Sequence, residues 1–263
     1  MIELYHNDMS VCAQKVRLTL AEKGLEWTGH HLNLRAGDQQ KPEYLKLNPA
    51  AVVPTLVDDG VVILESTVID EYLDDAYPAP PLKPADAAGR ARMRLWTKQL
   101  DEGVHFAAGT MSYCIAFRHQ FTVKPQAEID AYIASIPDPA RWVRIGEAIL
   151  KGTDASVFKD AVLRYRRLLV DIDAALRDGP WLAGASFSLA DIGFAPYITR
   201  LDQLGFQAWY DGLGPRIGAW FDRLRSRPAY AEAIGKWLNP QAVALLREKG
   251  GEAWPKVKSI VEG

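Results

Sequence analysis

Cysteine is scarce in this chain of 263 residues, which contains only Cys12 and Cys114. Two thiols are too few for a framework of disulfide bonds, so a small disulfide-stabilised secreted protein is excluded. No basic segment followed by an apolar run opens the chain, so we expect no export signal. We therefore expect a cytoplasmic protein in a reducing compartment.

Long apolar runs and an excess of charge of one sign are also missing. No stretch approaches the ~20 apolar residues that a membrane helix needs, so we expect no association with a membrane. The formal net charge of −2 gives no broad attraction to nucleic acid. Hydrophobic residues make up 48% of the chain and charged residues 24%, which is ordinary for a globular protein with a sizeable core.

Motifs for metal ions and nucleotides are absent too. His30 and His31 are adjacent and would point to opposite faces of a strand, and His6, His105 and His119 lack the spacing of metal ligands. The sequence contains no HExxH, CxxC or GxGxxG. We expect neither a metal nor a nucleotide.

The segment VVPTL, residues 52–56, is the most informative stretch that is present. Pro54 stands at the start of a short apolar run, and an X-Pro bond is the one peptide bond for which the cis form costs little. A turn at this position would leave the backbone of Val53 unpaired and able to pair with an extended peptide. The alternative is a proline at a strand edge with no further role.

A helix is predicted to begin at Glu65 and Ser66, because the apolar residues after them recur at helical spacing. The N-terminus of this helix would offer free N–H groups and the Ser66 hydroxyl to a carboxylate. Ser66 alone is equally consistent with a simple helix cap. Together with Val53, these residues describe a site for a small peptide with a charged end.

The first half of the chain is predicted to be α/β. Its elements follow the order strand, helix, strand, helix, strand, strand, helix, which indicates a thioredoxin-like domain over residues 1–78. The proline-rich residues 79–86 are the expected linker.

An all-helical domain is predicted over residues 87–263. One long helix is expected from residue 86 to about 120, bent at Gly103 or Gly109, followed by an insertion of short helical fragments over residues 122–156. Ser188 and Asp191 form a capping-box pattern that should begin a later helix.

Four segments of the chain resemble the soluble glutathione transferases. The resemblance is carried by KPEYLKLNPAAVVPTLVDDG and ILESTVIDEYLDDAYP in the first half, and by WLAGASFSLADIGFAP and PRIGAWFDRLRSRPAY in the second. It implies a cis bond before Pro54, pairing of Val53 with the cysteine of glutathione, and binding of the γ-glutamyl end by Glu65 and Ser66. It also implies a homodimer that uses glutathione as co-substrate.

The start of the first helix is where the family activates a thiol, because free N–H groups and the helix dipole favour an anion there. Ser10 falls at the position of the family's hydroxyl, and we expect it to stabilise the glutathione thiolate. The SxC pair that it forms with Cys12 resembles glutathione-dependent reductive dehalogenases, in which a cysteine at the position of Cys12 is a nucleophile. The alternatives are a helix cap for Ser10 and a buried core residue for Cys12.

Two further sets of residues complete the predicted site. Val52 stands where many family members have a lysine or glutamine for the glycine carboxylate of glutathione. Either glutathione binds with fewer polar contacts, or Lys41 or Gln40 reaches this carboxylate. The acceptor site should lie between the first helix and the long helix, capped by the insertion. Its expected lining residues suit a large planar substrate: His105, Phe106, Met111 and Tyr113.

We therefore expect a glutathione transferase that detoxifies small hydrophobic electrophiles. The alternative chemistry is glutathione-dependent reductive dehalogenation or aryl-ether cleavage, with the SxC pair as its marker. A protein of a different class is a further alternative, namely a non-catalytic binding module. The ganglioside-induced differentiation proteins are similar to this chain in having a long insertion between helices and a KVRL helix.

Overall fold

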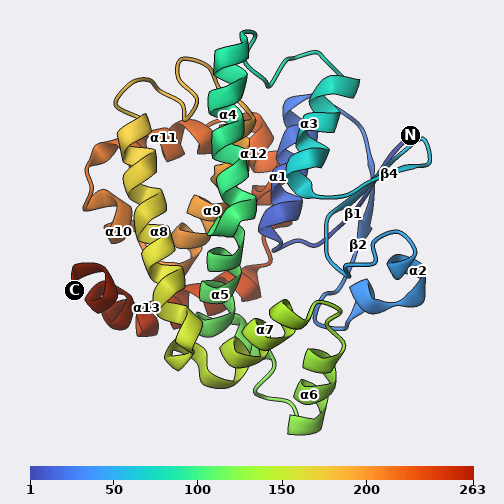
Figure 1. The fold of residues 1–263 in the computed structure, drawn as a ribbon, viewed down its shortest axis with the longest axis vertical. Helices are drawn as coiled ribbons and strands as arrows, with labels where there is room; N and C mark the ends of the chain where they lie inside the picture. The colour runs from blue at the N-terminus through green and yellow to red at the C-terminus, as the bar shows by residue number, and fades with distance from the viewer.

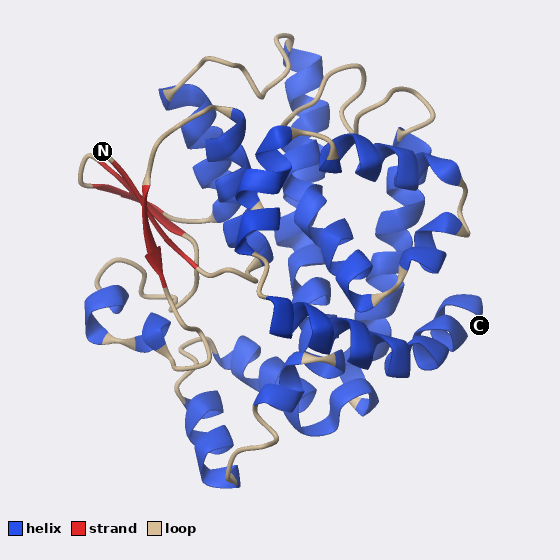
Figure 2. Cartoon of the chain, turned by 180° about the vertical axis from the view of Figure 1, so that it is seen from behind, coloured by secondary structure: helices blue, strands red, loops and turns tan.

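The computed structural model describes residues 1–263 and has two structurally different parts. A small sheet lies at one edge of the molecule and helices fill the remainder, as Figure 2 shows in red and blue. The predicted fold class, a thioredoxin-like α/β part followed by helices, is confirmed. The bounds proposed for the two domains stay a prediction, although no helix or strand occupies residues 77–86.

The first part has the predicted order of elements, with a short extra turn before the second helix. Its strands and helices are β1 (Ile2–His6), α1 (Val11–Glu22), β2 (Thr28–His31), α2 (Pro42–Leu45), β3 (Thr55–Asp58), β4 (Val61–Ile63) and α3 (Ser66–Ala76). The sequence predicts the second strand over residues 26–34, but β2 is shorter, because only Thr28–His31 pair with β1.

The four strands form a mixed sheet in the order β2-β1-β3-β4. β1 runs parallel to β2 and antiparallel to β3, with Leu4 opposite Leu56. Alternate residues of β1 point inward, which buries Leu4 completely against Val16 of α1 and Leu73 of α3. α1 and α3 therefore cover one face of the sheet and lie between it and the helical part (Figure 1).

The second part is a bundle around one large apolar core. Its helices are α4 (Ala87–Gln99), α5 (His105–Ile115), α6 (Gln126–Ala134), α7 (Pro139–Lys151), α8 (Ser156–Ala175), α9 (Leu189–Leu204), α10 (Gln207–Asp211), α11 (Pro215–Arg225), α12 (Pro228–Ala233) and α13 (Pro240–Glu262). None of the helices combines the length and the apolar content needed to traverse a lipid bilayer.

The long helix expected from residue 86 onward is interrupted at Gly103. A π-helical segment, Leu100–Val104, separates α4 from α5, and Gly103 within it has a φ of 136°. Such a φ strains any residue with a Cβ, so glycine is suited to this position. The second candidate for a bend, Gly109, lies inside regular α5.

The capping box predicted at the start of α9 is present. The Ser188 side chain accepts a hydrogen bond from the backbone of the first turn, and the Asp191 carboxylate accepts one from the Ser188 N–H. Asp191 also accepts hydrogen bonds from Trp220 Nε1 and the Leu182 N–H, and is fully buried. Its role is therefore structural: it fixes α9, which packs against α1.

Candidate functional site

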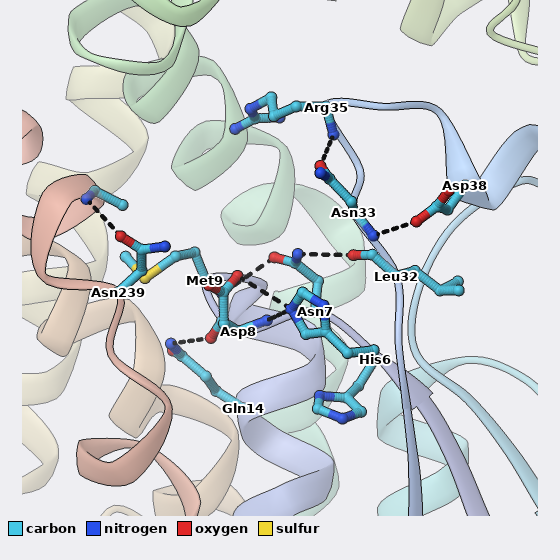
Figure 3. Close-up of polar contacts among 12 residues, drawn as sticks. His6, Asn7, Asp8, Met9, Gln14, Leu32, Asn33, Arg35, Asp38 and Asn239 are labelled. Atoms are coloured by element: carbon cyan, nitrogen blue, oxygen red, sulfur yellow. Dashed lines mark hydrogen bonds and ion pairs between the residues drawn. The ribbon is translucent and has the colours of Figure 1, made fainter.

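The turn between β1 and α1 presents the N-terminus of α1 to the helical part. Asn7 Nδ2 donates to the Leu32 carbonyl at 2.9 Å, and Gln14 Nε2 donates to the Asp8 carbonyl at 3.3 Å (Figure 3). From the other side, the buried guanidinium of Arg200 on α9 donates to the Met9 carbonyl at 2.7 Å. The residues that follow Met9 are thus held between the two parts of the protein.

Ser10 and Cys12 occupy different environments at this helix start. Ser10 has an extended backbone and caps α1, with its Oγ accepting a hydrogen bond from the Ala13 N–H at 3.3 Å. This is the contact expected for the simple cap interpretation. Cys12 is half-buried and lies against the core of the helical part.

Cys12 meets two polar side chains from distant segments. Its Sγ lies 3.3 Å from Nδ1 of His105, the first residue of α5. The hydroxyl of Tyr197 on α9 is 4.0 Å from the same sulfur and 3.3 Å from His105 Nδ1. A thiol, an imidazole and a phenol therefore meet at the junction of the two parts.

The surroundings of Cys12 favour the thiolate. Burial acts to raise the pKa of its thiol, but the positive charges of His105 and Lys15 outweigh burial and bring the pKa down to about 6. The Ser66 hydroxyl contributes to the lowered pKa as well. By contrast, burial raises the pKa of the Cys114 thiol to about 12, so only Cys12 has the ionisation of a reactive cysteine.

A second buried ionisable group, Asp70 of α3, lies near this cluster. Burial raises the pKa of its carboxyl to about 7, against the opposing attraction of Lys15. The Thr19 hydroxyl donates to Asp70 Oδ1 at 2.7 Å. Lys15, Thr19 and Asp70 are almost completely buried, so the interior between α1 and α3 is charged.

The residues expected to hold glutathione lie on neighbouring segments of the first part. The Val53–Pro54 bond is cis, and the backbone N–H and C=O of Val53 make no hydrogen bond within the chain. Glu65 is exposed and has a φ of 66°, an unfavourable conformation for glutamate that is typical of functional sites. Ser66 is buried as the first residue of α3.

Lys41 and Gln40 occupy a loop between β2 and α2. Lys41 Nζ forms an ion pair with Asp38 at 2.7 Å, and its side chain is 63% exposed. Gln40 is half-buried and its amide oxygen lies close to Gly37. The charge of Lys41 is therefore already paired with Asp38 in the structure.

The expected acceptor residues are divided between two faces of α5. His105, Phe106 and Tyr113 lie on its accessible side, where Phe106 is 47% exposed and has the Arg144 guanidinium 4.4 Å from its ring centroid. Met111 lies in the core with 1% exposure. The structure therefore does not bring Met111 to the face shared by the other three residues.

Three charged or polar side chains near the candidate site were not predicted from the sequence: Lys15, Tyr197 and Arg35. Arg35, in the loop after β2, donates from Nη1 to the Tyr113 hydroxyl at 3.1 Å. Lys15 stands three positions after Cys12 on α1, so helical spacing could have indicated that the two side chains are neighbours. No local pattern in the sequence indicated Tyr197 or Arg35, because the residues that they contact lie more than seventy positions away along the chain.

Family models match both parts of the chain. Residues 9–76 match the N-terminal domain of glutathione S-transferase and residues 153–223 match its C-terminal domain. The protein LigF of Sphingobium sp. is 30% identical over 94% of this chain and 98% of its own length. The tetrachloro-p-hydroquinone reductive dehalogenase of Sphingobium chlorophenolicum is 29% identical over 88% of this chain and 95% of its own length.

Solved structures give the same relationship. The beta-etherase LigF from Sphingobium sp. strain SYK-6 superposes with a TM-score of 0.82 at 29% identity, covering 89% of this chain and 99% of LigF. A theta-class glutathione S-transferase from Xanthomonas axonopodis pv. citri, solved with glutathione bound, superposes with a TM-score of 0.63 at 26% identity, covering 89% of this chain and 96% of that one.

Proposed function

Because this chain belongs to the glutathione S-transferase family, we propose that it couples glutathione transfer to a reductive step in which Cys12 is the nucleophile. The enzyme is a glutathione transferase that uses glutathione as co-substrate and catalyses attack of the glutathione thiolate on a hydrophobic electrophile. The reductive step and the residues that perform it are the proposal.

The observation that carries this proposal is the distance of 3.3 Å between Cys12 Sγ and His105 Nδ1. An imidazole at this distance can take the thiol proton and then stabilise the thiolate as its partner in an ion pair. With its pKa lowered to about 6, most Cys12 is thiolate at pH 7. A transferase that activates only glutathione has no need of a second ionised thiol.

The proposed reaction has three steps. First, the glutathione thiolate displaces a leaving group from the electrophile and forms a thioether. Second, the Cys12 thiolate attacks the glutathione sulfur of that thioether, so that the carbon–sulfur bond breaks and its electron pair leaves with the substrate carbon, which takes a proton. Third, the thiolate of a second glutathione attacks the Cys12–glutathione disulfide, regenerates the Cys12 thiolate and releases oxidised glutathione.

This sequence limits the substrates, because the departing carbon must hold an electron pair. A carbon beside a carbonyl, or a ring carbon of a quinone-type tautomer, meets that condition. The name of one relative, a tetrachloro-p-hydroquinone reductive dehalogenase, gives a halogenated aromatic substrate, and that of another, a beta-etherase, gives an ether bond. We therefore propose halogenated or aryl-ether-bearing aromatic compounds as the electrophile, with detoxification as the outcome.

Glutathione itself is proposed to bind to the first part. Val53 offers an unpaired backbone N–H and C=O for the cysteinyl residue of glutathione, next to the cis-Pro54. Glu65 and Ser66 lie at the start of α3, where a carboxylate and a hydroxyl suit the γ-glutamyl amine and carboxylate. Ser10 lies two positions before Cys12 and is the proposed stabiliser of the glutathione thiolate.

We also propose a homodimer in the cytoplasm. Four exposed apolar side chains lie on β4, α3 and α4: Val61, Val62, Val68 and Leu95. A partner subunit would remove this apolar surface from water.

A mass measurement tests the reductive step. After incubation with oxidised glutathione, the wild-type protein should gain one glutathione on Cys12, and the Cys12→Ala variant should gain none. With a glutathionyl aryl ketone as substrate, wild type plus glutathione should release the free ketone and oxidised glutathione. If Cys12→Ala releases the ketone at the wild-type rate, the chain is a transferase without a reductive step. If wild type shows no turnover and no binding at millimolar glutathione, a non-catalytic binding module takes its place.

A further inference from the structure

One side of α5 is open between its two polar ends. His105, Gly109 and Tyr113 recur every four positions, so they lie along one stripe of the helix. A Cβ added to Gly109 would meet no atom within 4 Å. There is therefore open space above the backbone of α5 midway between His105 and Tyr113.

The two ends of this stripe have different chemistry. At His105 the Cys12 sulfur lies 3.3 Å from the imidazole. At Tyr113 the hydroxyl accepts a hydrogen bond from Arg35 Nη1 at 3.1 Å and lies 3.4 Å from the Tyr132 hydroxyl of α6. With a rise of 1.5 Å per residue, His105 and Tyr113 are about 12 Å apart along the helix. The two positions of α5 that contact Cys12 and Arg35 are therefore separated by roughly the length of two aromatic rings.

Arg35 is rigidly presented at the far end. The Asn33 side chain accepts hydrogen bonds from the N–H groups of Arg35 and Ala36, and Asp38 accepts one from the Asn33 N–H. Figure 3 shows the Arg35 side chain extending away from Asn33 and Asp38 toward the green helices. Its guanidinium lies among three aromatic rings, 4.6 Å from the ring centroid of Phe117, 5.3 Å from that of Phe121 and 5.4 Å from that of Tyr113.

The positive charge at this end has no carboxylate partner. The Arg35 guanidinium donates only to Gln120 and Tyr113, which are neutral acceptors, and it forms no ion pair. Its remaining N–H groups have no acceptor in the chain. Arg141 and Arg144 of the insertion also form no ion pair, and Arg144 stacks on Phe106. Burial acts to raise the pKa of the Tyr113 hydroxyl, but Arg35, the hydrogen bond with Tyr132 and Arg141 together outweigh burial and lower the pKa.

We propose that the electrophile is an elongated aromatic compound with an anionic group, which lies along α5 with its reactive carbon at Cys12 and its anion at Arg35. This inference rests on the proposed function and specifies its substrate. An arginine with free N–H groups binds a carboxylate or phenolate through charge-assisted hydrogen bonds. Phe106 and Gly109 provide an aromatic wall and an open floor for the rings between the two ends.

Three electrophiles with the same reactive group separate length from charge. They are 4′-(chloroacetyl)biphenyl-4-carboxylic acid, its methyl ester, and 2-chloroacetophenone, which lacks the distal ring and the anion. The measured quantity is kcat/KM with glutathione, corrected for the spontaneous reaction. Wild type should prefer the acid to the ester by about tenfold, the scale of one hydrogen bond to a charged group.

Two variants and one control test the assignment. Arg35→Gln should bring the acid-to-ester ratio close to one, whereas Arg92→Gln, which removes an exposed arginine of α4, should keep the wild-type ratio. Gly109→Leu should lower kcat/KM for the biphenyl ester relative to 2-chloroacetophenone, because the added side chain fills the open space. Thermal unfolding checks that each variant is folded.

The outcomes separate the two proposals. Equal kcat/KM for acid and ester in wild type, or an unchanged ratio in folded Arg35→Gln, would overturn the anion site. Failure of all three electrophiles to turn over would count against the catalytic function instead. In that case, calorimetry with the glutathione thioethers of the acid and the ester still measures the anion preference directly.

Discussion

Cys12 and His105 are 93 positions apart in the chain, yet Cys12 Sγ lies 3.3 Å from His105 Nδ1. The contact joins the first turn of α1 to the first turn of α5, and thus the thioredoxin-like part to the helical part. Tyr197 of α9 completes the group, 3.3 Å from the same nitrogen. The ionisation of the thiol is therefore set by residues from both parts.

The first prediction concerns the reactivity of Cys12 with pH. Alkylation by iodoacetamide should rise with pH and reach half of its maximum near pH 6, because only the thiolate reacts and the pKa is lowered to about 6. His105→Asn removes the positive charge that lowers the pKa, so the midpoint should move upward. At pH 7 the rate should fall about twofold for a rise of one unit in the pKa and about tenfold for a rise of two units, because the thiolate fraction falls by these factors.

Cys114 is the internal control for this experiment. It is buried and its thiol pKa is raised to about 12, so it should stay unmodified in the folded protein at every pH tested. Mass spectrometry of the two cysteine peptides separates the sites. An unchanged midpoint in His105→Asn would show that His105 does not set the ionisation of Cys12.

Much of the fold followed from local patterns in the sequence. The capping box at Ser188 and the glycine break at Gly103 each depend on a few neighbouring residues, and each is present. The length of β2 was overestimated, because pairing with β1 limits it to Thr28–His31. Strand length depends on a partner elsewhere in the chain, which local composition does not specify.

The candidate site was predictable only in part, for the same reason. Ser10, Cys12 and Ser66 stand at helix starts, which capping chemistry reveals from sequence. The pairing of Cys12 with His105 depends on how two helices pack, and a single sequence contains no measure of that. Met111 illustrates the limit: it was expected at the acceptor site, but its position on α5 turns it into the core.

The second prediction separates the two serines. Ser66→Ala should weaken glutathione binding by about 1–2 kcal/mol, the scale of a lost hydrogen bond to a charged group. Ser10→Ala should instead raise the pKa of the bound glutathione thiol and slow its transfer to an electrophile, with smaller loss of affinity. Calorimetry measures the affinity, and the ultraviolet absorbance of the bound thiolate measures its ionisation. A Ser10→Ala enzyme with unchanged turnover would exclude Ser10 as the activating hydroxyl.

The third prediction concerns folding stability and Asp70. Burial raises the pKa of its carboxyl to about 7, above the unfolded value of about 3.9, so between these values the folded state holds more protons than the unfolded state. The stability contributed by Asp70 should therefore fall as pH rises through this window, by up to about 1.4 kcal/mol per pH unit, and level off above pH 7. Asp70→Asn keeps an acceptor for Thr19 and removes the titration.

Urea unfolding at pH 5, 6, 7 and 8 tests this prediction. The stability of Asp70→Asn minus that of wild type should increase from pH 5 to pH 7 and then remain constant. The matched control is Asp75→Asn, which replaces an exposed carboxylate next to the buried Asp74. The stability of this variant minus that of wild type should change little with pH. A constant difference for Asp70→Asn across the range would mean that Asp70 is ionised in the folded protein at pH 5.

The last prediction links the backbone at Gly103 to the chemistry at Cys12. Gly103 has a φ of 136°, so Gly103→Ala should lower the free energy of unfolding by about 1–3 kcal/mol, the cost of a non-glycine residue in such a conformation. The matched control is Gly251→Ala in α13, where an added Cβ meets no atom and alanine should stabilise the helix by up to about 1 kcal/mol. Since Gly103 directly precedes the turn that places His105, a folded Gly103→Ala protein should also alkylate Cys12 more slowly at pH 7. Loss of stability with an unchanged alkylation rate would show that His105 reaches Cys12 independently of the π-helical segment.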